Sequence, residues 1–236
     1  MNMNTRNVIA GTLALFLGSS LALRAADGMT TFSARSGSKM RIEGTSNIHD
    51  WQVESSIIGG SFQASSDFPV EPGQAVKPGK VDAHGDIFLT VRSLKSLEKD
   101  GKPYSDSMDA RMWEKLVGTN TTPVEKIVFQ IKELTLKEAA KDKDSEYTYD
   151  CTGDLAVAGV TNKVTLPVKV LPMANKKIKI TGTTTLKMTD FHIDPPAPKI
   201  ALSLIKTGDE VKIIFTWMVG PQLAKPAAAA AAAGKN

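Results

Sequence analysis

The 236-residue sequence contains one cysteine and three histidines, and charge of neither sign is concentrated in it. The single cysteine, Cys151, excludes an intrachain disulfide and a multi-cysteine metal site. The formal net charge is only +4, with lysines and acidic residues interleaved, so nothing predicts nucleic-acid binding. No nucleophile elbow, zinc-protease motif or phosphate-binding loop occurs. The composition therefore offers little for catalysis, and we predict no catalytic residue.

Long apolar runs are also scarce, and the clearest one lies near the N-terminus. Residues 8–17 are mostly apolar, follow Arg6 and precede several small residues. This is the pattern of a secretory signal peptide, which we place at residues 1–25 with cleavage at about residues 22–26. The run is too short to be a good membrane span, so we expect no stable anchor after cleavage. The expected location is the periplasm or the cell exterior.

The C-terminal residues 222–236 are rich in alanine. A run of seven alanines is too short to hold a helix alone in water, so we predict a disordered tail. Between the two ends, residues 29–219 are of a length that fits one domain. An exported domain without disulfides must be stable through its core alone.

The body of the chain alternates apolar and polar residues with a period of two. The segment around Ile127, Phe129 and Ile131 is typical, with Lys126 and Gln130 between them. We count about eight such segments, which predicts half-buried antiparallel strands. Helices do not alternate with these strands, so the sheet is expected to close on itself as a barrel or to pack as a sandwich.

One segment, residues 106–117, has helical spacing instead. Met108, Met112 and Leu116 recur at intervals of four, and Trp113 flanks them. Acidic residues in the first turn favour the same short helix. An isolated helix of this length is stable only when docked, so its methionine face must cover a cavity or plug a filled core.

Several small residues occupy the same alternating positions as the apolar residues, so they face the same side of the strands. They leave volume inside a barrel of about eight strands, which can enclose one small ligand, or they relieve strain where strands bend. Both interpretations remain open from the pattern. The residues concerned are Gly44, Ser55, Gly59, Gly85, Gly153, Gly182 and Thr184.

Histidines provide the few candidates for chemistry. His49 and Asp50 are adjacent, so regular strand geometry points them to opposite faces. Asp190 and His192 lie two residues apart and could share a face. Polar residues at the rim of a barrel are the favoured interpretation, and we predict no metal site.

Four stretches of the chain resemble the YceI-like family, in a divergent subgroup with "HDW" in the early motif. The stretches are "SKMRIEGTSNIHDWQVESSIIGGSF", "DARMWEKLVGTNTTPVEKIVFQI", "GDLAVAGVTNKVTLPVKV" and "KITGTTTLKMTDFHIDPP". The resemblance implies an all-β, eight-stranded antiparallel, lipocalin-like barrel with one short inserted helix. It also implies a bound isoprenoid lipid or quinone-like molecule and no shared catalytic residues.

The leading hypothesis is therefore an exported, non-enzymatic carrier of a hydrophobic isoprenoid lipid, for transport, storage or stress protection. No cofactor other than such a lipid is expected. The candidate partners are a quinone-using inner-membrane protein and a second copy of the chain. The predicted ligand-binding residues are His49, Trp51, Val53, Ile57, Met108, Met112, Trp113, Phe129, Phe191 and Trp217.

Two alternatives come from other functional classes. The first is an enzyme or redox partner that acts on a quinone head group through His49, Asp190 or His192. The second is an interaction protein with a filled barrel and no ligand.

Overall fold

The computed structural model describes residues 28–117, 124–197, 199–200 and 203–222. The predicted signal peptide and all but the first residue of the predicted tail lie outside these residues. Within the described ranges, no helix combines the length and apolarity needed to cross a membrane.

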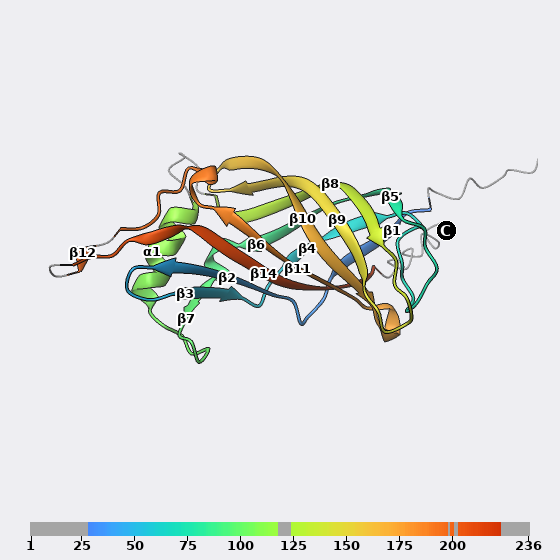
Figure 1. The fold of residues 1–236 in the computed structure, drawn as a ribbon, viewed down its shortest axis with the longest axis horizontal. Helices are drawn as coiled ribbons and strands as arrows, with labels where there is room; N and C mark the ends of the chain where they lie inside the picture. Colours follow the sequence, from blue (N-terminus) through green and yellow to red (C-terminus); the bar gives the residue numbers. More distant parts are fainter. Residues whose placement is uncertain (1–27, 118–123, 198, 201–202, 223–236) are drawn as a thin grey trace, which may run out of the picture.

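Eight antiparallel strands close into a barrel (Figure 1). Around the ring they are β1 (Thr30–Ala34), β4 (Gly59–Ala64), β6 (Ala83–Thr90), β8 (Lys126–Glu138), β9 (Tyr147–Val157), β10 (Val160–Pro172), β11 (Ile178–Lys187) and β14 (Thr207–Pro221). The ring closes where β14 pairs with β1, with Phe32 opposite Pro221. This confirms the predicted eight-stranded barrel over the sandwich.

Strand β14 also carries a second branch of the sheet. Its first part pairs with β2 (Lys39–Ser46), which pairs with β3 (Trp51–Ser55), and β3 pairs with β7 (Lys95–Leu97). The wall next to β14 is therefore formed by β1 at one end of the barrel and by β2, β3 and β7 at the other. The remaining elements are β5 (Gly79–Val81), β12 (Lys199–Ile200), β13 (Ser203–Leu204) and the 3-10 helices η1 (Val91–Ser93), η2 (Ala174–Lys176) and η3 (Thr189–Phe191).

The period of two in the sequence corresponds to the two faces of this wall. Along β9, for example, Tyr147, Tyr149 and Cys151 are buried inside the barrel, whereas Thr148 and Asp150 between them are not. The same alternation recurs in the neighbouring strands, so apolar side chains from all around the ring meet in one interior.

Aromatic side chains fill one end of that interior. The rings of Phe32 and Phe62 stack with centroids 4.9 Å apart, and Phe62 contacts Phe68 at 5.3 Å and Trp217 at 5.7 Å. Phe68 reaches Tyr149 at 5.9 Å. Rings of this size bury a large apolar area, so this half of the barrel is a packed core. We call it the closed end.

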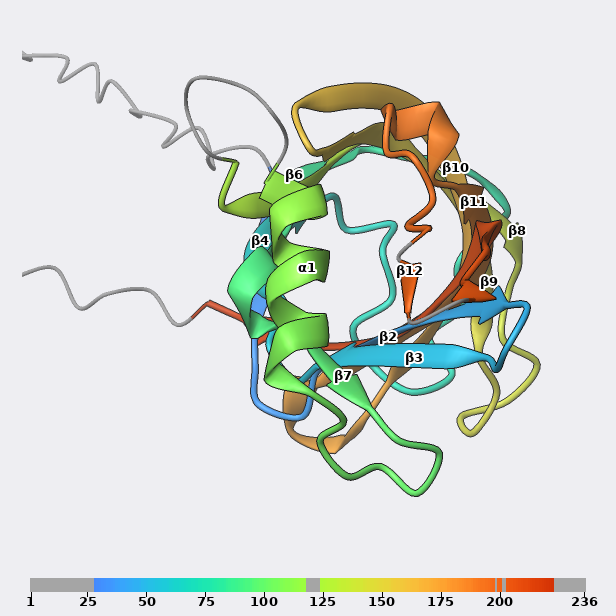
Figure 2. The same ribbon diagram turned by 90° about the vertical axis from the view of Figure 1, so that its left-hand side faces the viewer.

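Helix α1 (Asp106–Val117) lies at the opposite end, which we call the mouth. Seen along the barrel, the helix runs across one side of the opening, above β2, β3 and β7 (Figure 2). Its bounds agree with the predicted residues 106–117. The acidic Asp106 and Asp109 lie in the first turn and Lys115 lies in the last, as expected for the charge asymmetry of a helix.

Candidate ligand-binding cavity

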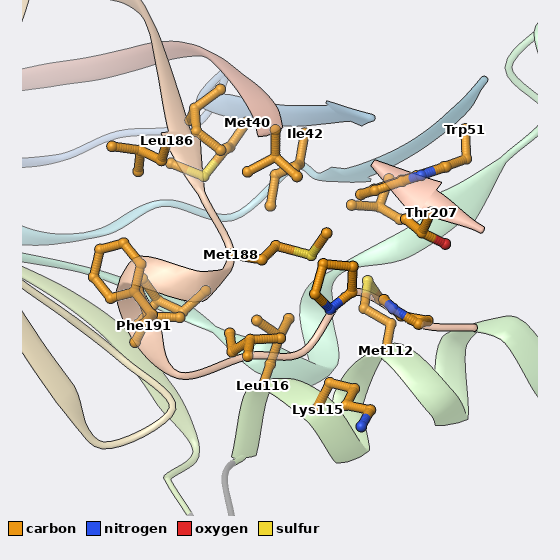
Figure 3. A pocket seen from close by; sticks show the side chains of 18 of the residues that line it. Met40, Ile42, Trp51, Met112, Lys115, Leu116, Leu186, Met188, Phe191 and Thr207 are labelled. Atoms are coloured by element: carbon orange, nitrogen blue, oxygen red, sulfur yellow. The ribbon is translucent and has the colours of Figure 1, made fainter. Parts of the chain in front are cut away.

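A cavity of about 1020 Å³ occupies the barrel between the aromatic core and α1. This is at the upper end of the range for small-molecule sites. In Figure 3, Met112 and Leu116 of α1 face Met40 and Ile42 of β2 across the space, and Met188 lies between them in this view. The cavity is therefore open space inside the half of the barrel that the core does not fill.

Most of the wall is apolar, and it is drawn from β2, β3, β6, β8, β9, β10, β11 and β14. Trp217 lies toward the closed end, because it contacts the core ring of Phe62. The sequence analysis did not select many of the residues in this wall. The alternation along each strand had nevertheless already placed them on the inward, apolar face. The residues missed in this way include Met40, Ile42, Ile87, Leu155, Leu186, Val211, Ile213 and Phe215.

Eight of the ten predicted ligand-binding residues line this cavity. They are His49, Trp51, Val53, Met108, Met112, Phe129, Phe191 and Trp217. The structure brings them together from segments that are far apart in the sequence. Their contact with a ligand stays a prediction.

Ile57 does not line the cavity, and its neighbour Ile58 does. Ile57 is 59% exposed, whereas Ile58 is 4% exposed. The strand β3 ends at Ser55, whose hydroxyl accepts a hydrogen bond from the backbone N of Ile57 (3.0 Å) and contacts the Ser93 hydroxyl (2.8 Å). This side-chain turn shifts the alternation by one residue, which the period-two pattern alone does not reveal.

Trp113 also lies outside the cavity wall, because it is on the side of α1 that faces η1 and β7. Its indole Nε1 donates to the carbonyl oxygen of Leu94 (3.0 Å), and Lys95 Nζ lies 4.5 Å from the ring centroid. Residue 113 is about 100° around the helix from Met112. Trp113 therefore helps to attach the helix, while Met108, Met112 and Leu116 face the cavity.

A buried carboxylate provides the other attachment of α1. Asp109 is 3% exposed, and its Oδ1 accepts hydrogen bonds from the backbone N (2.6 Å) and hydroxyl (2.7 Å) of Ser96. Lys95 Nζ lies 3.1 Å from Oδ2. Desolvation by burial acts to raise the pKa of Asp109, but the hydrogen bonds from Ser96 and Lys95 outweigh it and lower that pKa below its ordinary value.

We predict that Asp109→Ala lowers the free energy of unfolding by about 1–3 kcal/mol at pH 7, because it leaves the Ser96 N–H buried without a partner. Since the folded-state pKa is lowered, the contribution of Asp109 is complete above the unfolded value of about 3.9 and is lost as the pH falls through the folded value. The difference in free energy of unfolding between the wild type and Asp109→Ala, measured with urea, should therefore be smaller at pH 3 than at pH 7. Asp106→Ala, in the same helical turn but exposed, is the control; equal effects of the two variants would contradict this role.

Two glycines in the strands of the barrel wall lie under aromatic rings. A Cβ at Gly44 would come within 2.1 Å of the Trp51 ring, and one at Gly182 within 2.5 Å of the Phe215 ring. At neither glycine is φ positive. The volume that these glycines leave is thus occupied by a ring from the adjacent strand, lying close against the wall. This is a third role, different from both that the sequence left open.

The segment after β11 completes the mouth next to the last turn of α1, where Leu116 packs against the cluster that contains Phe191 and Ile193. Asp209 accepts hydrogen bonds from the backbone N (2.9 Å) and hydroxyl (2.7 Å) of Thr189, which anchors η3. Phe191 in η3 is buried with Val157 and Ile193, and it lines the cavity. The sequence "MTDFHI" therefore folds into a turn that places one aromatic ring at the mouth.

The structure does not bring together the residues considered for chemistry on a head group. His49 lines the cavity, but Asp190 and His192 are not in its wall and both are exposed. Within the described ranges, no group of three or more histidine, cysteine or acidic residues is arranged to hold a metal ion. Burial raises the pKa of the Cys151 thiol to about 12, so it stays protonated and unreactive.

Two solved structures share this barrel. A polyisoprenoid-binding domain from Saccharophagus degradans, implicated in plant cell wall breakdown, is 13% identical with a TM-score of 0.55, covering 82% of this chain and 99% of that one. BcnA from Burkholderia cenocepacia is 16% identical with a TM-score of 0.51, covering 77% of this chain and 95% of that one. At these identities the likeness shows the fold. No curated protein matches the chain.

The sequence itself matches the YceI-like domain over residues 34–218. That stretch runs from the end of β1 almost to the end of β14, so it includes the whole cavity wall and α1. The match covers most of the chain and agrees with the eight-stranded barrel, and the chain therefore belongs to the YceI-like family.

Proposed function

We propose that this chain is an exported binding protein that holds a hydrophobic isoprenoid lipid inside the barrel. The observation that carries this proposal is the cavity of about 1020 Å³ between the aromatic core and α1, with its predominantly apolar lining. A closed barrel of eight strands has room for one ligand. The related domain from Saccharophagus degradans is described as polyisoprenoid-binding, which supports the same ligand class here.

The chemistry of the wall favours a long, flexible chain over a rigid ligand. Met40, Met108, Met112 and Met188 all line the cavity. Methionine side chains are unbranched and polarisable, so they adapt to ligands of irregular shape. A branched isoprenoid chain presents such a surface along its length.

The proposal extends to location and role. The apolar run at residues 8–17 favours export, and a binding protein without a catalytic cluster is suited to transport, storage or protection of a lipid. A quinone-like lipid is the proposed cargo, and an inner-membrane protein that uses quinones is the proposed partner.

The direct test is to recover the lipid from the natively exported protein. We expect organic extraction of the purified full chain to release an isoprenoid lipid in about a one-to-one ratio with protein, measured by mass spectrometry against an internal standard. An equally abundant exported protein from the same cells, purified in parallel, controls for adventitious membrane lipid. Recovery of only the lipids found in that control would contradict the proposal.

A further inference from the structure

We infer that the polar end of the lipid is held in a second, smaller pocket beside the main cavity, and that this pocket selects a neutral head group bearing a hydroxyl. The inference rests on the proposed function, because it assigns the head group of the same lipid whose chain occupies the barrel.

The smaller pocket has a volume of about 380 Å³, the space of roughly twelve water molecules. It lies at the mouth, between β3, β7 and the loop that leads to α1. The two spaces share one wall, formed by His49, Trp51, Val53, Tyr104 and Met108. Five of the six residues that line only the smaller pocket have polar side chains: Asp50, Gln52, Ser96, Glu98 and Lys99. The two spaces are therefore adjacent, and a lipid whose apolar chain lies in the main cavity has a place for its polar head in the smaller one.

His49 gives the shared wall a hydrogen-bond acceptor. Its Nδ1 lies 2.8 Å from the backbone oxygen of Asp50. A carbonyl oxygen only accepts hydrogen bonds, so the neutral imidazole carries its proton on Nδ1. Nε2 then has a lone pair, and nothing in the described part of the chain hydrogen-bonds to it. The ring packs against Tyr104, with centroids 6.2 Å apart, which restrains its orientation.

Two polar groups of the smaller pocket are already engaged within the protein. The Gln52 side-chain amide donates to the backbone oxygen of Glu98 (2.6 Å). The Ser96 hydroxyl donates to Asp109 Oδ1 (2.7 Å). The first contact joins β3 to the residue after β7, and the second joins β7 to α1, so the two groups shape the pocket and contribute little hydrogen-bonding capacity to a ligand.

The groups that remain are mainly acceptors. The carboxylates of Asp50 and Glu98 only accept, as does His49 Nε2, whereas Lys99 donates and the Tyr104 hydroxyl does either. A hydroxyl on the lipid supplies the hydrogen that these acceptors lack. A phosphate would meet the two carboxylates as well as the Lys99 ammonium, so the net charge of the pocket disfavours it. An ether or quinone carbonyl leaves His49 Nε2 without a donor. The pocket chemistry therefore fits a phenol, a hydroquinone or a free alcohol.

The test compares three probes with the same chain: a geranylgeranyl-substituted phenol, its methyl ether, and geranylgeranyl phosphate. Each is titrated into the lipid-stripped full chain and followed by tryptophan fluorescence. We expect the phenol to bind about two- to tenfold more tightly than the ether, as one hydrogen bond allows, and the phosphate to bind least. Geranylgeraniol, run in parallel, distinguishes a hydroxyl at the chain end from one on a ring.

Two variants locate the selectivity. His49→Phe keeps a ring against Tyr104 but removes the acceptor, so the ratio of phenol affinity to ether affinity should fall to about one. His84→Phe, on the exposed outer face of β6, should keep the preference. Equal binding of phenol and ether to the wild type, or tightest binding of the phosphate, would overturn the head-group assignment but leave lipid binding standing. Failure of every probe to bind would overturn the proposed function and this assignment with it.

Discussion

Replacing Met112 by tryptophan is expected to reduce the affinity for a long-chain isoprenoid roughly tenfold while leaving the empty protein about as stable as the wild type. Met112 lies on the cavity side of α1 (Figure 3). The larger indole would take space from about two methylene groups of ligand, and each buried methylene contributes about 0.8 kcal/mol. The measurements are lipid retained per protein, by extraction and mass spectrometry, and urea unfolding of the lipid-free variant.

The matched control for Met112→Trp is Ala110→Trp, which adds the same side chain to the exposed side of the same helix. It should leave lipid retention unchanged. If the space around Met112 were packed core, the added bulk would destabilise the empty protein by about 1–3 kcal/mol instead. A strongly destabilised Met112→Trp protein that retains lipid normally would therefore show that α1 is a plug and not part of a ligand site.

The second large effect is expected from Gly182→Val, which should impair both folding and lipid binding. A Cβ at this position would lie 2.5 Å from the Phe215 ring and 3.0 Å from the backbone oxygen of Pro167. Since the backbone cannot move easily, the ring must turn away from the wall and into the cavity. We expect a loss of about 1–3 kcal/mol of stability together with reduced lipid retention.

The control for Gly182→Val is Thr183→Val, the adjacent and exposed position of β11. Valine is favoured in strands, so a loss of stability at residue 182 but not at residue 183 isolates the steric effect from β-propensity. Thermal unfolding of both lipid-free proteins, with parallel extraction, makes the comparison. Normal lipid retention by Gly182→Val would mean that the cavity does not depend on the position of the Phe215 ring.

Regular patterns in the sequence were sufficient to predict the helix and most of the ring strands, but not the short strands β1 and β4. The two faces of β9 are visible in the alternation of Tyr147, Tyr149 and Cys151 with polar residues. The bounds of α1 follow from the spacing of Met108, Met112 and Leu116 and from the acidic first turn. These features are local, because a period of two or of 3.6 residues reports which side of an element is dry.

Features that depend on contacts between distant segments could not be predicted in this way. The Ser55 hydroxyl breaks the alternation through a turn with Ile57 and a contact with Ser93, so a pattern counted along one strand fails there. Trp113 shares the apolar character of Met112, and only its hydrogen bond to Leu94 reveals which side of the helix it serves. The position of an apolar residue on a helix does not by itself say whether it faces a ligand or the protein.

The sequence also could not show which part of the barrel interior is filled by side chains and which part is empty. The sequence shows that Gly44 and Gly182 are on the dry face, but not that Trp51 and Phe215 cover them. Cross-strand pairing decides this, since Gly44 lies opposite Trp51 and Gly182 opposite Phe215. Register between strands is set by the whole barrel, so it is not written in any one segment.

The aromatic packing at the closed end allows the barrel to empty without unfolding. Phe32, Phe62, Phe68 and Trp217 bury one another whether or not anything occupies the other half of the barrel. Release of a bound lipid would then expose the cavity-lining side chains but leave the aromatic packing in place. In the proposed function, a bound lipid would add to the free energy of unfolding by mass action, and folding would not require it. On the proposed function, stability and lipid binding would therefore depend on largely different side chains, with Trp217 common to both.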